Sequence, residues 1–202
     1  MNLRDTYNTI AQEWHRDHQS DTWWQEGTDI FLSHLKSGAR VLDAGCAGGY
    51  KTKYIASRGY AVEGIDLSDA FIAIAKREQP NLRFHQMDIR DIEVLPDTYD
   101  AIYTSAVLLH FPKNELRTQL EKFNTKLHDQ GYLYIAVKGQ RPGGVEEEVK
   151  TEHDYGYPYE RFFSYYTKAD LESACVNAGF TIVFSSVVHT GNTDWITVVA
   201  QK

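Results

Sequence analysis

Residues 40–49, RVLDAGCAGG, constrain the fold most, because an apolar run leads directly into a turn that contains three glycines. A short apolar run bounded by turn residues predicts a buried strand, and the sequence after the glycines favours a helix. Glycine accepts positive φ and has no Cβ, so the backbone can turn tightly and approach a ligand closely. The turn therefore predicts a nucleotide-like ligand. An ordinary glycine-containing turn is the alternative, and the motif alone does not separate the two.

Aspartates recur where the predicted strands end. The first run contains Asp43, the run at 60–65 is followed by Asp66, and the run at 82–87 is followed by Asp88. Asp66 follows the first loop glycine by about twenty residues, the spacing at which a doubly wound fold places an acid for ribose hydroxyls. The carboxyl ends of parallel strands share one edge of the sheet, so the three acids are expected to face one site. Each aspartate alone is also a common helix cap or turn residue.

Together the motifs VLDAGCAGG, GIDLS, MDIRD and YDAIYTSAVLLHFPKNEL resemble those of small-molecule class I S-adenosylmethionine-dependent methyltransferases, from about Arg40 to the C-terminus. The resemblance implies an α/β, Rossmann-like, doubly wound fold with a seven-stranded sheet and helices on both faces. The implied strand order is 3-2-1-4-5-7-6, with the last strand antiparallel. Apolar runs at 99–103 and 131–137 suit the fourth and fifth strands, and those at 179–184 and 195–200 flank the turn residues Gly191 and Asn192.

The resemblance also implies S-adenosyl-L-methionine as the cofactor, S-adenosyl-L-homocysteine as its product, and methyl transfer by in-line displacement to a small molecule. The glycine turn is expected at the methionine end, with Asp43 reaching the ammonium through water. Asp66 is expected on the ribose, and Asp88 with the Ile89 N–H on the adenine. Leu67 would pack on the adenine face, and Ser105 and Ala106 would line the methyl-donor side. The full cofactor set is Asp43, Gly45, Cys46, Ala47, Gly49, Asp66, Leu67, Asp88, Ile89, Ser105 and Ala106.

The loop departs from the family pattern at Ala47, where glycine is usual, and at Gly48, where a small or hydroxyl residue is common. We expect cofactor binding to tolerate the additional methyl group if φ at Ala47 is negative. The same departure counts against an NAD-linked oxidoreductase, because a G-x-G-x-x-G fingerprint from Gly45 needs glycine at Ala47 and Tyr50. A cofactor-binding regulatory or pseudo-enzyme module without catalysis stays open as the main alternative.

Two segments are expected to cover the site. Residues 1–37 predict a helical cap, because Tyr7, Ile10, Ala11 and Trp14 have helical spacing and a second helix is expected over 22–36. By the family resemblance Tyr7 lies near the transferred methyl, although aromatic side chains of this kind often only dock helices on a core. Residues 139–166 are too long for an ordinary connection, and we expect them to form a substrate lid.

The candidates for acceptor binding or catalysis are His110, Tyr7, Arg161 and Phe163. His110 follows the fourth strand and resembles a family histidine that acts as a base or orients the acceptor; it would otherwise bond a loop or cap a helix. Arg161 and its aromatic neighbours suit an aromatic or carboxylated metabolite, and pairing with the acidic run at 146–148 is the alternative. Phe163 offers apolar area either to a substrate or to packing, and the acidic run is expected to be a solvated turn or helix end.

Length and composition set further bounds. At 202 residues, with no linker of low complexity, the chain predicts a single domain over 1–202. The formal charge of −7 and the lack of a basic stripe argue against nucleic acid as a partner. No apolar stretch approaches the ~20 residues that cross a bilayer, and no secretory signal is present, so we expect a cytoplasmic protein. The oligomeric state is left open.

The remaining titratable residues suggest no further chemistry. Cys46 and Cys175 lie in different elements and are expected to be reduced and structural. His15 and His18 lack further ligands at suitable spacing, so no metal site is expected and both are assigned to the surface. Lys51 and its neighbour Lys53 are expected on a solvated helix face.

Overall fold

A computed structural model describes residues 2–202, which form one seven-stranded sheet flanked by helices. The strand order is β3-β2-β1-β4-β5-β9-β8; β1 to β5 run parallel, and β9 is antiparallel to β5 and β8. This confirms the expected order and the antiparallel last strand. The strands are β1 Arg40–Ala44, β2 Ala61–Asp66, β3 Arg83–Gln86, β4 Tyr99–Ser105, β5 Leu127–Lys138, β8 Thr181–Thr190 and β9 Thr193–Gln201.

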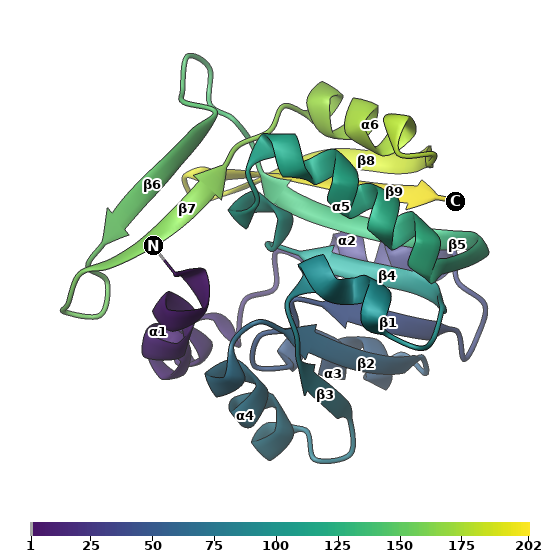
Figure 1. Cartoon of the computed structure of the whole chain (residues 1–202), viewed down its shortest axis with the longest axis horizontal. Coiled ribbons are helices and arrows are strands. Elements are labelled where there is room, and N and C mark those ends of the chain that lie inside the picture. Colours follow the sequence, from purple (N-terminus) through teal and green to yellow (C-terminus); the bar gives the residue numbers. More distant parts are fainter. Residues whose placement is uncertain (1) are drawn as a thin grey trace.

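Helices cover both faces of the sheet, as expected. In Figure 1, α5 and α6 lie in front of the sheet, and α2 and α3 lie behind it. The first helix, α1, packs beside α4 at the edge where β1 and β2 end. The helices are α1 Leu3–His18, α2 Gln25–Ser33, α3 Tyr50–Ser57, α4 Asp69–Glu78, α5 Lys113–Lys126 and α6 Lys168–Asn177, with the short 3₁₀ turns η1 Ile89–Val94 and η2 Leu108–His110.

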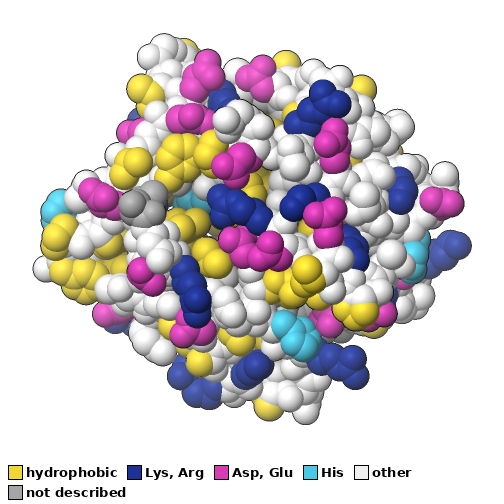
Figure 2. Space-filling model, in the orientation of Figure 1, with side chains coloured by type: hydrophobic (Ala, Val, Ile, Leu, Met, Phe, Trp, Pro, Cys, Tyr) yellow, Lys and Arg dark blue, Asp and Glu magenta, His cyan; other side chains and the backbone are white. Residues whose placement is uncertain are grey.

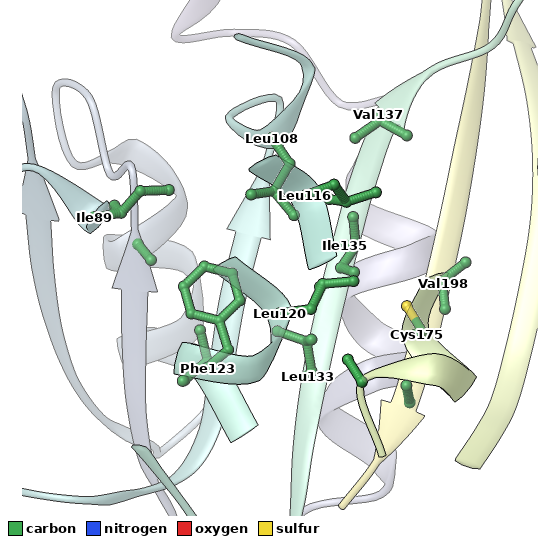
Figure 3. Packing of buried hydrophobic residues seen from close by; sticks show 14 of the residues in the cluster. Ile89, Leu108, Leu116, Leu120, Phe123, Leu133, Ile135, Val137, Cys175 and Val198 are labelled. Carbon is green, nitrogen blue, oxygen red and sulfur yellow. The ribbon is translucent and has the colours of Figure 1, made fainter. Parts of the chain in front are cut away.

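The two cores follow from the alternation of side chains along the strands. On β5, Leu133 and Ile135 face the layer of α5, whereas Tyr134 faces the layer of α2 and α3. Figure 3 shows Leu116 and Leu120 of α5 lying against this first set. Removing a fully buried leucine such as Leu120 costs about 2–5 kcal/mol, so these contacts hold the strand ends that carry the site in place.

The start of α4 is specified locally. Ser68 is its N-cap and accepts a hydrogen bond from the Phe71 N–H at 3.1 Å. An N-cap of this kind contributes about 1 kcal/mol to the helix. Because Ser68 follows Asp66 by two residues, the chain leaves β2, presents the acid and turns into α4 within one short segment. This explains why the GIDLS motif fixes the position of Asp66.

A second, two-stranded sheet lies within residues 139–166. Its antiparallel strands are β6 Glu147–Glu152 and β7 Tyr159–Ser164, and Figure 1 shows this hairpin extending from the main sheet toward α1. The two ends of the 139–166 segment are joined by an isolated β-bridge between Gly139 and Tyr166. The expectation of a solvated turn for residues 146–148 is therefore wrong, since Glu147 and Glu148 begin a strand that pairs with β7.

The two N-terminal helices are present, with different lengths. α1 extends beyond the expected 7–14 segment in both directions, and Asn2 caps it by accepting from the Arg4 N–H at 3.1 Å. α2 is shorter than the expected 22–36 segment, because residues 22–25 form a separate turn closed by a hydrogen bond from Gln25 N–H to Thr22 C=O. No helix within residues 2–202 is both long and apolar enough to cross a membrane.

Candidate functional site

A cavity of about 390 Å³ lies at the carboxyl ends of the parallel strands. Its walls come from α1, from the segments after β1, β2 and β4, and from β7. Figure 2 shows hydrophobic side chains gathered around a hollow in this face, with acidic and basic side chains along its edge. Thirteen of the fifteen residues that the sequence indicated line the cavity: Tyr7, Gly45, Cys46, Ala47, Asp66, Leu67, Asp88, Ile89, Ser105, Ala106, His110, Arg161 and Phe163.

The glycine turn after β1 forms the floor of the cavity. Two of its glycines are packed so closely against neighbouring side chains that a Cβ would not fit. Gly45 has φ +92°, and a Cβ there would lie 2.1 Å from Val107 Cγ2. At Gly48 a Cβ would lie 2.1 Å from Nδ1 of His15, so α1 packs directly on this backbone. The N–H groups of Gly45 and Cys46 both donate to the Ile65 carbonyl, at 2.8 and 2.9 Å, which ties the turn to β2.

The condition placed on Ala47, a negative φ, is not met. Ala47 has φ +46°, a left-handed conformation that costs a non-glycine residue roughly 1–2 kcal/mol. This conformation directs the Ala47 N–H toward Asp66, whose Oδ2 accepts it at 2.9 Å. The hydrogen bond to a carboxylate offsets the strain, so the loop keeps the conformation that glycine would take.

Asp66 lines the cavity and accepts hydrogen bonds on both carboxylate oxygens. Oδ1 accepts from the Ser68 N–H at 2.9 Å, and Oδ2 accepts from Ala47. Each carboxylate oxygen has a second acceptor site, so the group can still bind hydroxyl donors of a ligand. Burial raises the pKa of Asp66 to about 6, while the two backbone N–H groups act in the opposite direction. The carboxylate is thus largely ionised at neutral pH.

Two of the expected cofactor residues lie outside the cavity. Asp43 is only 2% exposed, and its carboxylate accepts a 2.6 Å hydrogen bond from Thr52 beneath the turn. Gly49 caps α3 on the side of Phe84, away from the cavity. Their part is to shape the turn from below, and the geometry offers neither of them direct contact with a ligand.

Lys51 is buried, which contradicts its assignment to a solvated helix face. Its ammonium donates to Ser105 Oγ at 2.8 Å and lies 5.2 Å from the centre of the Trp23 ring. Burial lowers the pKa of Lys51 and raises that of Asp43, and each charge partly stabilises the other. No carboxylate among residues 2–202 pairs directly with Lys51, which lines the cavity beside Ser105.

Asp88 lines the cavity at the end of β3. Its Oδ1 accepts from the Arg90 N–H at 2.9 Å and so caps η1, while Oδ2 lies 3.3 Å from the Arg90 guanidinium. The neighbouring Ile89 is 4% exposed and belongs to the core in front of the sheet. Asp88 therefore combines the capping role that any aspartate could play with a position facing the cavity.

A chain of hydrogen bonds joins Tyr7, His110 and β7 on the opposite wall. His110 Nδ1 lies 2.7 Å from the Phe162 carbonyl oxygen, which can only accept, so Nδ1 carries the proton. Nε2 then accepts from the Tyr7 hydroxyl at 2.6 Å. Burial and the positive charges of Arg161 and Lys138 lower the pKa of His110 to about 3. Burial also raises the pKa of Tyr7, so His110 is neutral and Tyr7 protonated at neutral pH.

Arg161 is held in place by Glu152 rather than by the acidic run at 146–148. Its Nε and Nη2 donate to the two carboxylate oxygens of Glu152 at 2.6 and 2.8 Å. Its Nη1 lies 3.4 Å from the Tyr7 hydroxyl. The Arg161 and Glu152 side chains are 13% and 10% exposed, so this bidentate pair is one of the more buried ion pairs in the structure. Phe163, next to it, is 1% exposed and packs under the guanidinium.

The sequence did not indicate several residues that line the same cavity. Lys138 is the last residue of β5. Ligands in such folds bind at the carboxyl ends of strands, and this rule could have identified Lys138 from the sequence. The others come from segments whose position only the fold reveals: Leu3, Trp14, His18, Asp21, Trp23, Tyr50, Lys51, Phe71, Arg90, Val107, Leu109, Phe111, Thr190, Thr193 and Trp195.

The histidines of α1 serve packing. His15 is 4% exposed, so its assignment to the surface is wrong; its Nε2 donates to Glu78 at 2.9 Å. His18 stacks on Trp14, with ring centroids 4.3 Å apart. Residues 2–202 contain no group of three or more His, Cys, Asp or Glu side chains placed to hold a metal ion. Cys46 and Cys175 are both buried as free thiols.

Solved structures of methyltransferases share this fold. The 1,6-didemethyltoxoflavin-N1-methyltransferase of Burkholderia thailandensis, with bound S-adenosylhomocysteine, has a TM-score of 0.78 at 20% identity, over 99% of this chain and 87% of that one. The magnesium protoporphyrin IX methyltransferase of Synechocystis PCC 6803, also with bound S-adenosylhomocysteine, has a TM-score of 0.76 at 19% identity, over 99% and 98%. At these identities the likeness shows the fold alone.

Sequence comparison identifies the family. The ubiquinone biosynthesis O-methyltransferase of Pseudomonas savastanoi pv. phaseolicola is 35% identical over 81 residues, which are 38% of this chain and 35% of that protein. The match thus spans about a third of the relative's length. A family model described as a methyltransferase domain matches residues 14–184, well over half of the chain. The resemblance drawn from the motifs is confirmed, and the chain belongs to the methyltransferase domain family.

Proposed function

We propose that the protein transfers a methyl group from S-adenosyl-L-methionine to a small-molecule acceptor by in-line displacement. One observation carries the proposal: a single cavity combines a glycine turn and an acid on one side with a tyrosine, a histidine and aromatic rings on the other. The first side suits an adenosyl ligand, and the second suits an organic acceptor. The names of the relatives, which include enzymes for ubiquinone, toxoflavin and magnesium protoporphyrin methylation, support a small acceptor.

The residues of the cavity floor fit the cofactor. The turn from Gly45 to Ala47 lines the cavity with only small side chains, and Asp66 has free acceptor sites for the ribose hydroxyls. Lys51 is a buried cation with no carboxylate partner among residues 2–202, so we assign it to the methionine carboxylate. Asp88, Ile89 and Leu67 are assigned to the adenine, and Ser105 and Ala106 to the methyl-donor side. When bound, the cofactor supplies an electrophilic methyl group on a sulfonium sulfur.

We assign an orienting role to Tyr7 and His110. Protonating a ring whose pKa is about 3 costs roughly 5 kcal/mol at neutral pH, so His110 is a poor base. Its hydrogen bond to the Phe162 carbonyl fixes the tautomer and directs Nε2 at Tyr7. The Tyr7 hydroxyl donates a hydrogen bond to this nitrogen and accepts one from Arg161 Nη1, which leaves one oxygen lone pair for a donor on the acceptor. Holding the acceptor close and in line supplies several kcal/mol of the barrier.

The two covering segments exclude water in this proposal. Residues 1–37 act as a helical cap and residues 139–166 as a lid. Support comes from contacts between them: Arg161 of β7 lies against Tyr7 of α1, and the Tyr157 hydroxyl lies 3.4 Å from the Thr9 carbonyl oxygen. Excluding water strengthens the electrostatic interactions within the cavity and keeps the donor from hydrolysis.

Calorimetric titration followed by a labelled-methyl assay tests the function. We expect the protein to bind S-adenosylmethionine and S-adenosylhomocysteine at micromolar to millimolar concentrations, and NAD not at all. A panel of small aromatic and carboxylated acceptors is then incubated with methyl-labelled donor, with Asp66→Ala as the control variant. Failure to bind either adenosyl compound overturns the proposal, and binding without transfer to any acceptor favours a non-catalytic module.

The compartment is also a proposal. We propose a cytoplasmic location, in keeping with the sequence and with a cavity suited to small metabolites. Fractionation of cells that express the tagged protein tests it, and recovery in the membrane fraction contradicts it.

A further inference from the structure

Lys138 stands out among the charged residues of the acceptor side. It ends β5 and is half-buried, and its side chain lines the cavity. Its ammonium lies 4.2 Å from the centre of the Phe163 ring. Across residues 2–202 this nitrogen forms neither a hydrogen bond nor an ion pair. A half-buried cation that is supported by only one ring face has lost hydration without gaining a counterion, which is unfavourable.

The acidic groups nearby are already engaged. Both oxygens of Glu152 accept from Arg161, and Glu148 accepts from the Tyr165 hydroxyl at 2.7 Å. Burial, and after it the positive charge of Arg161, lowers the pKa of Lys138 to about 8. Glu152 and Glu148 oppose this shift, while Lys150 adds to it. The ammonium remains the major form at neutral pH, and it is free to pair with an anionic group that enters the cavity.

Arg161 is less suited to that role than the sequence indicated. Its two best-placed donors are bound to Glu152, and its remaining contact is with Tyr7. Freeing the guanidinium would remove both hydrogen bonds to the nearly buried Glu152 carboxylate and leave it only the Lys150 ammonium, 3.8 Å away, which is strongly unfavourable. Lys138 needs no such rearrangement, because nothing has to be displaced before it binds an anion.

We propose that the acceptor is a small aromatic acid, whose anionic group binds Lys138 beside the Phe163 ring. The proposal rests on the proposed function and specifies the substrate class of the same cavity. The charge of Lys138 selects an anion, and the rings of Tyr7, Phe111 and Phe163 supply flat apolar walls. Lys138 is thus a residue that determines specificity, while Tyr7 and His110 orient the reacting group.

Binding of benzoate and benzamide tests the assignment, since these probes share a ring and nearly the same size but differ in charge. Each is titrated by NMR into the full-length protein, with and without saturating S-adenosylhomocysteine. We expect benzoate to bind the wild type about tenfold more tightly than benzamide, the size of one charge-assisted hydrogen bond. Lys138→Met should abolish the preference, and Lys138→Arg should retain part of it. Lys53→Met, which removes an exposed lysine, should leave the preference unchanged.

The outcomes separate this inference from the proposed function. Equal binding of the two probes by the wild type, no binding of benzoate at millimolar concentration, or an acid preference that survives in Lys138→Met overturns the role of Lys138. Binding of S-adenosylhomocysteine is measured in the same samples and does not depend on either probe. If the wild type does not bind S-adenosylhomocysteine, the proposed function is overturned. If Lys138→Met binds it as the wild type does, this variant is folded.

Discussion

Replacing Gly48 by alanine tests whether close packing of α1 on the glycine turn holds the site together. The new Cβ would lie 2.1 Å from His15 Nδ1, whereas ordinary contacts begin at 3.4 Å. The imidazole therefore has to retreat by roughly 1 Å or more, and its 2.9 Å hydrogen bond to Glu78 is strained or lost. The backbone at Gly48 does not have positive φ, so the alanine itself adds no conformational strain.

The expected cost follows from three terms. Overpacking of this kind costs about 1–3 kcal/mol, and a lost hydrogen bond costs about 1 kcal/mol. Alanine also adds roughly 0.4–1 kcal/mol to the stability of the folded state, because it lowers the conformational entropy of the unfolded chain. We therefore expect Gly48→Ala to lower the free energy of unfolding by about 1–3.5 kcal/mol. Turnover should fall as well, because α1 also carries Tyr7.

Urea denaturation of four proteins gives the decisive measurement: wild type, Gly48→Ala, His15→Ala and the double variant. Without the imidazole the new methyl group has space, so Gly48→Ala should cost little in the His15→Ala background. The coupling energy between the two substitutions should then be at least about 1 kcal/mol, within the range for contacting residues. If Gly48→Ala costs the same in both backgrounds, the contact does not account for the requirement for glycine and this reasoning fails.

Three further predictions concern the cavity. Asp66→Ala should weaken S-adenosylmethionine binding by about 1–3 kcal/mol through lost charge-assisted hydrogen bonds, measured by calorimetry, and an unchanged affinity contradicts the ribose assignment. Tyr7→Phe should lower kcat/KM for the acceptor about tenfold and leave cofactor affinity unchanged; a loss near 10⁴-fold indicates proton transfer instead of orientation. The pKa of His110 is about 3 in the folded protein, against an ordinary 6.5, so unfolding takes up a proton between these values. The free energy of unfolding should therefore fall as the pH drops from 6.5 toward 3, and His110→Gln should show a shallower fall in the same urea titrations.

The main sheet was predictable because each of its strands is specified locally. The run around Leu42 is apolar and ends in glycines, and the run before Asp66 ends in a helix cap, so periodicity and turn chemistry agree. The carboxyl ends of parallel strands meet at one edge in this topology. For that reason the assignment of Asp66 and Asp88 to a single cavity needed no knowledge of long-range packing.

The hairpin, the burial of Lys51 and the conformation of Ala47 were not predictable in the same way. The residues around Glu147 are mostly charged, and their strand forms only because β7 supplies a partner for each backbone group. Lys51 was assigned to solvent by its charge, but the first turn of α3 faces Ser105 and the Trp23 ring. Ala47 adopts positive φ because Asp66, nineteen residues away in sequence, accepts its N–H. Such contacts depend on the assembled fold rather than on neighbours in the chain.

The bridge between Gly139 and Tyr166 has a consequence for how acceptor choice can diverge in proteins of this architecture. The chain leaves the main sheet and returns to it at adjacent points, so the loop at 153–158 between β6 and β7 can lengthen, shorten or change in composition without altering the path of β5 or α6. Arg161 and Phe163 lie inside this closed excursion, whereas Asp66 and the glycine turn lie outside it. The part of acceptor recognition proposed for Arg161 and Phe163 is therefore carried by a different stretch of chain from the proposed donor site. The part proposed for Lys138, Tyr7 and His110 stays with the main fold, so changing the excursion would retune acceptor preference around a constant group of residues.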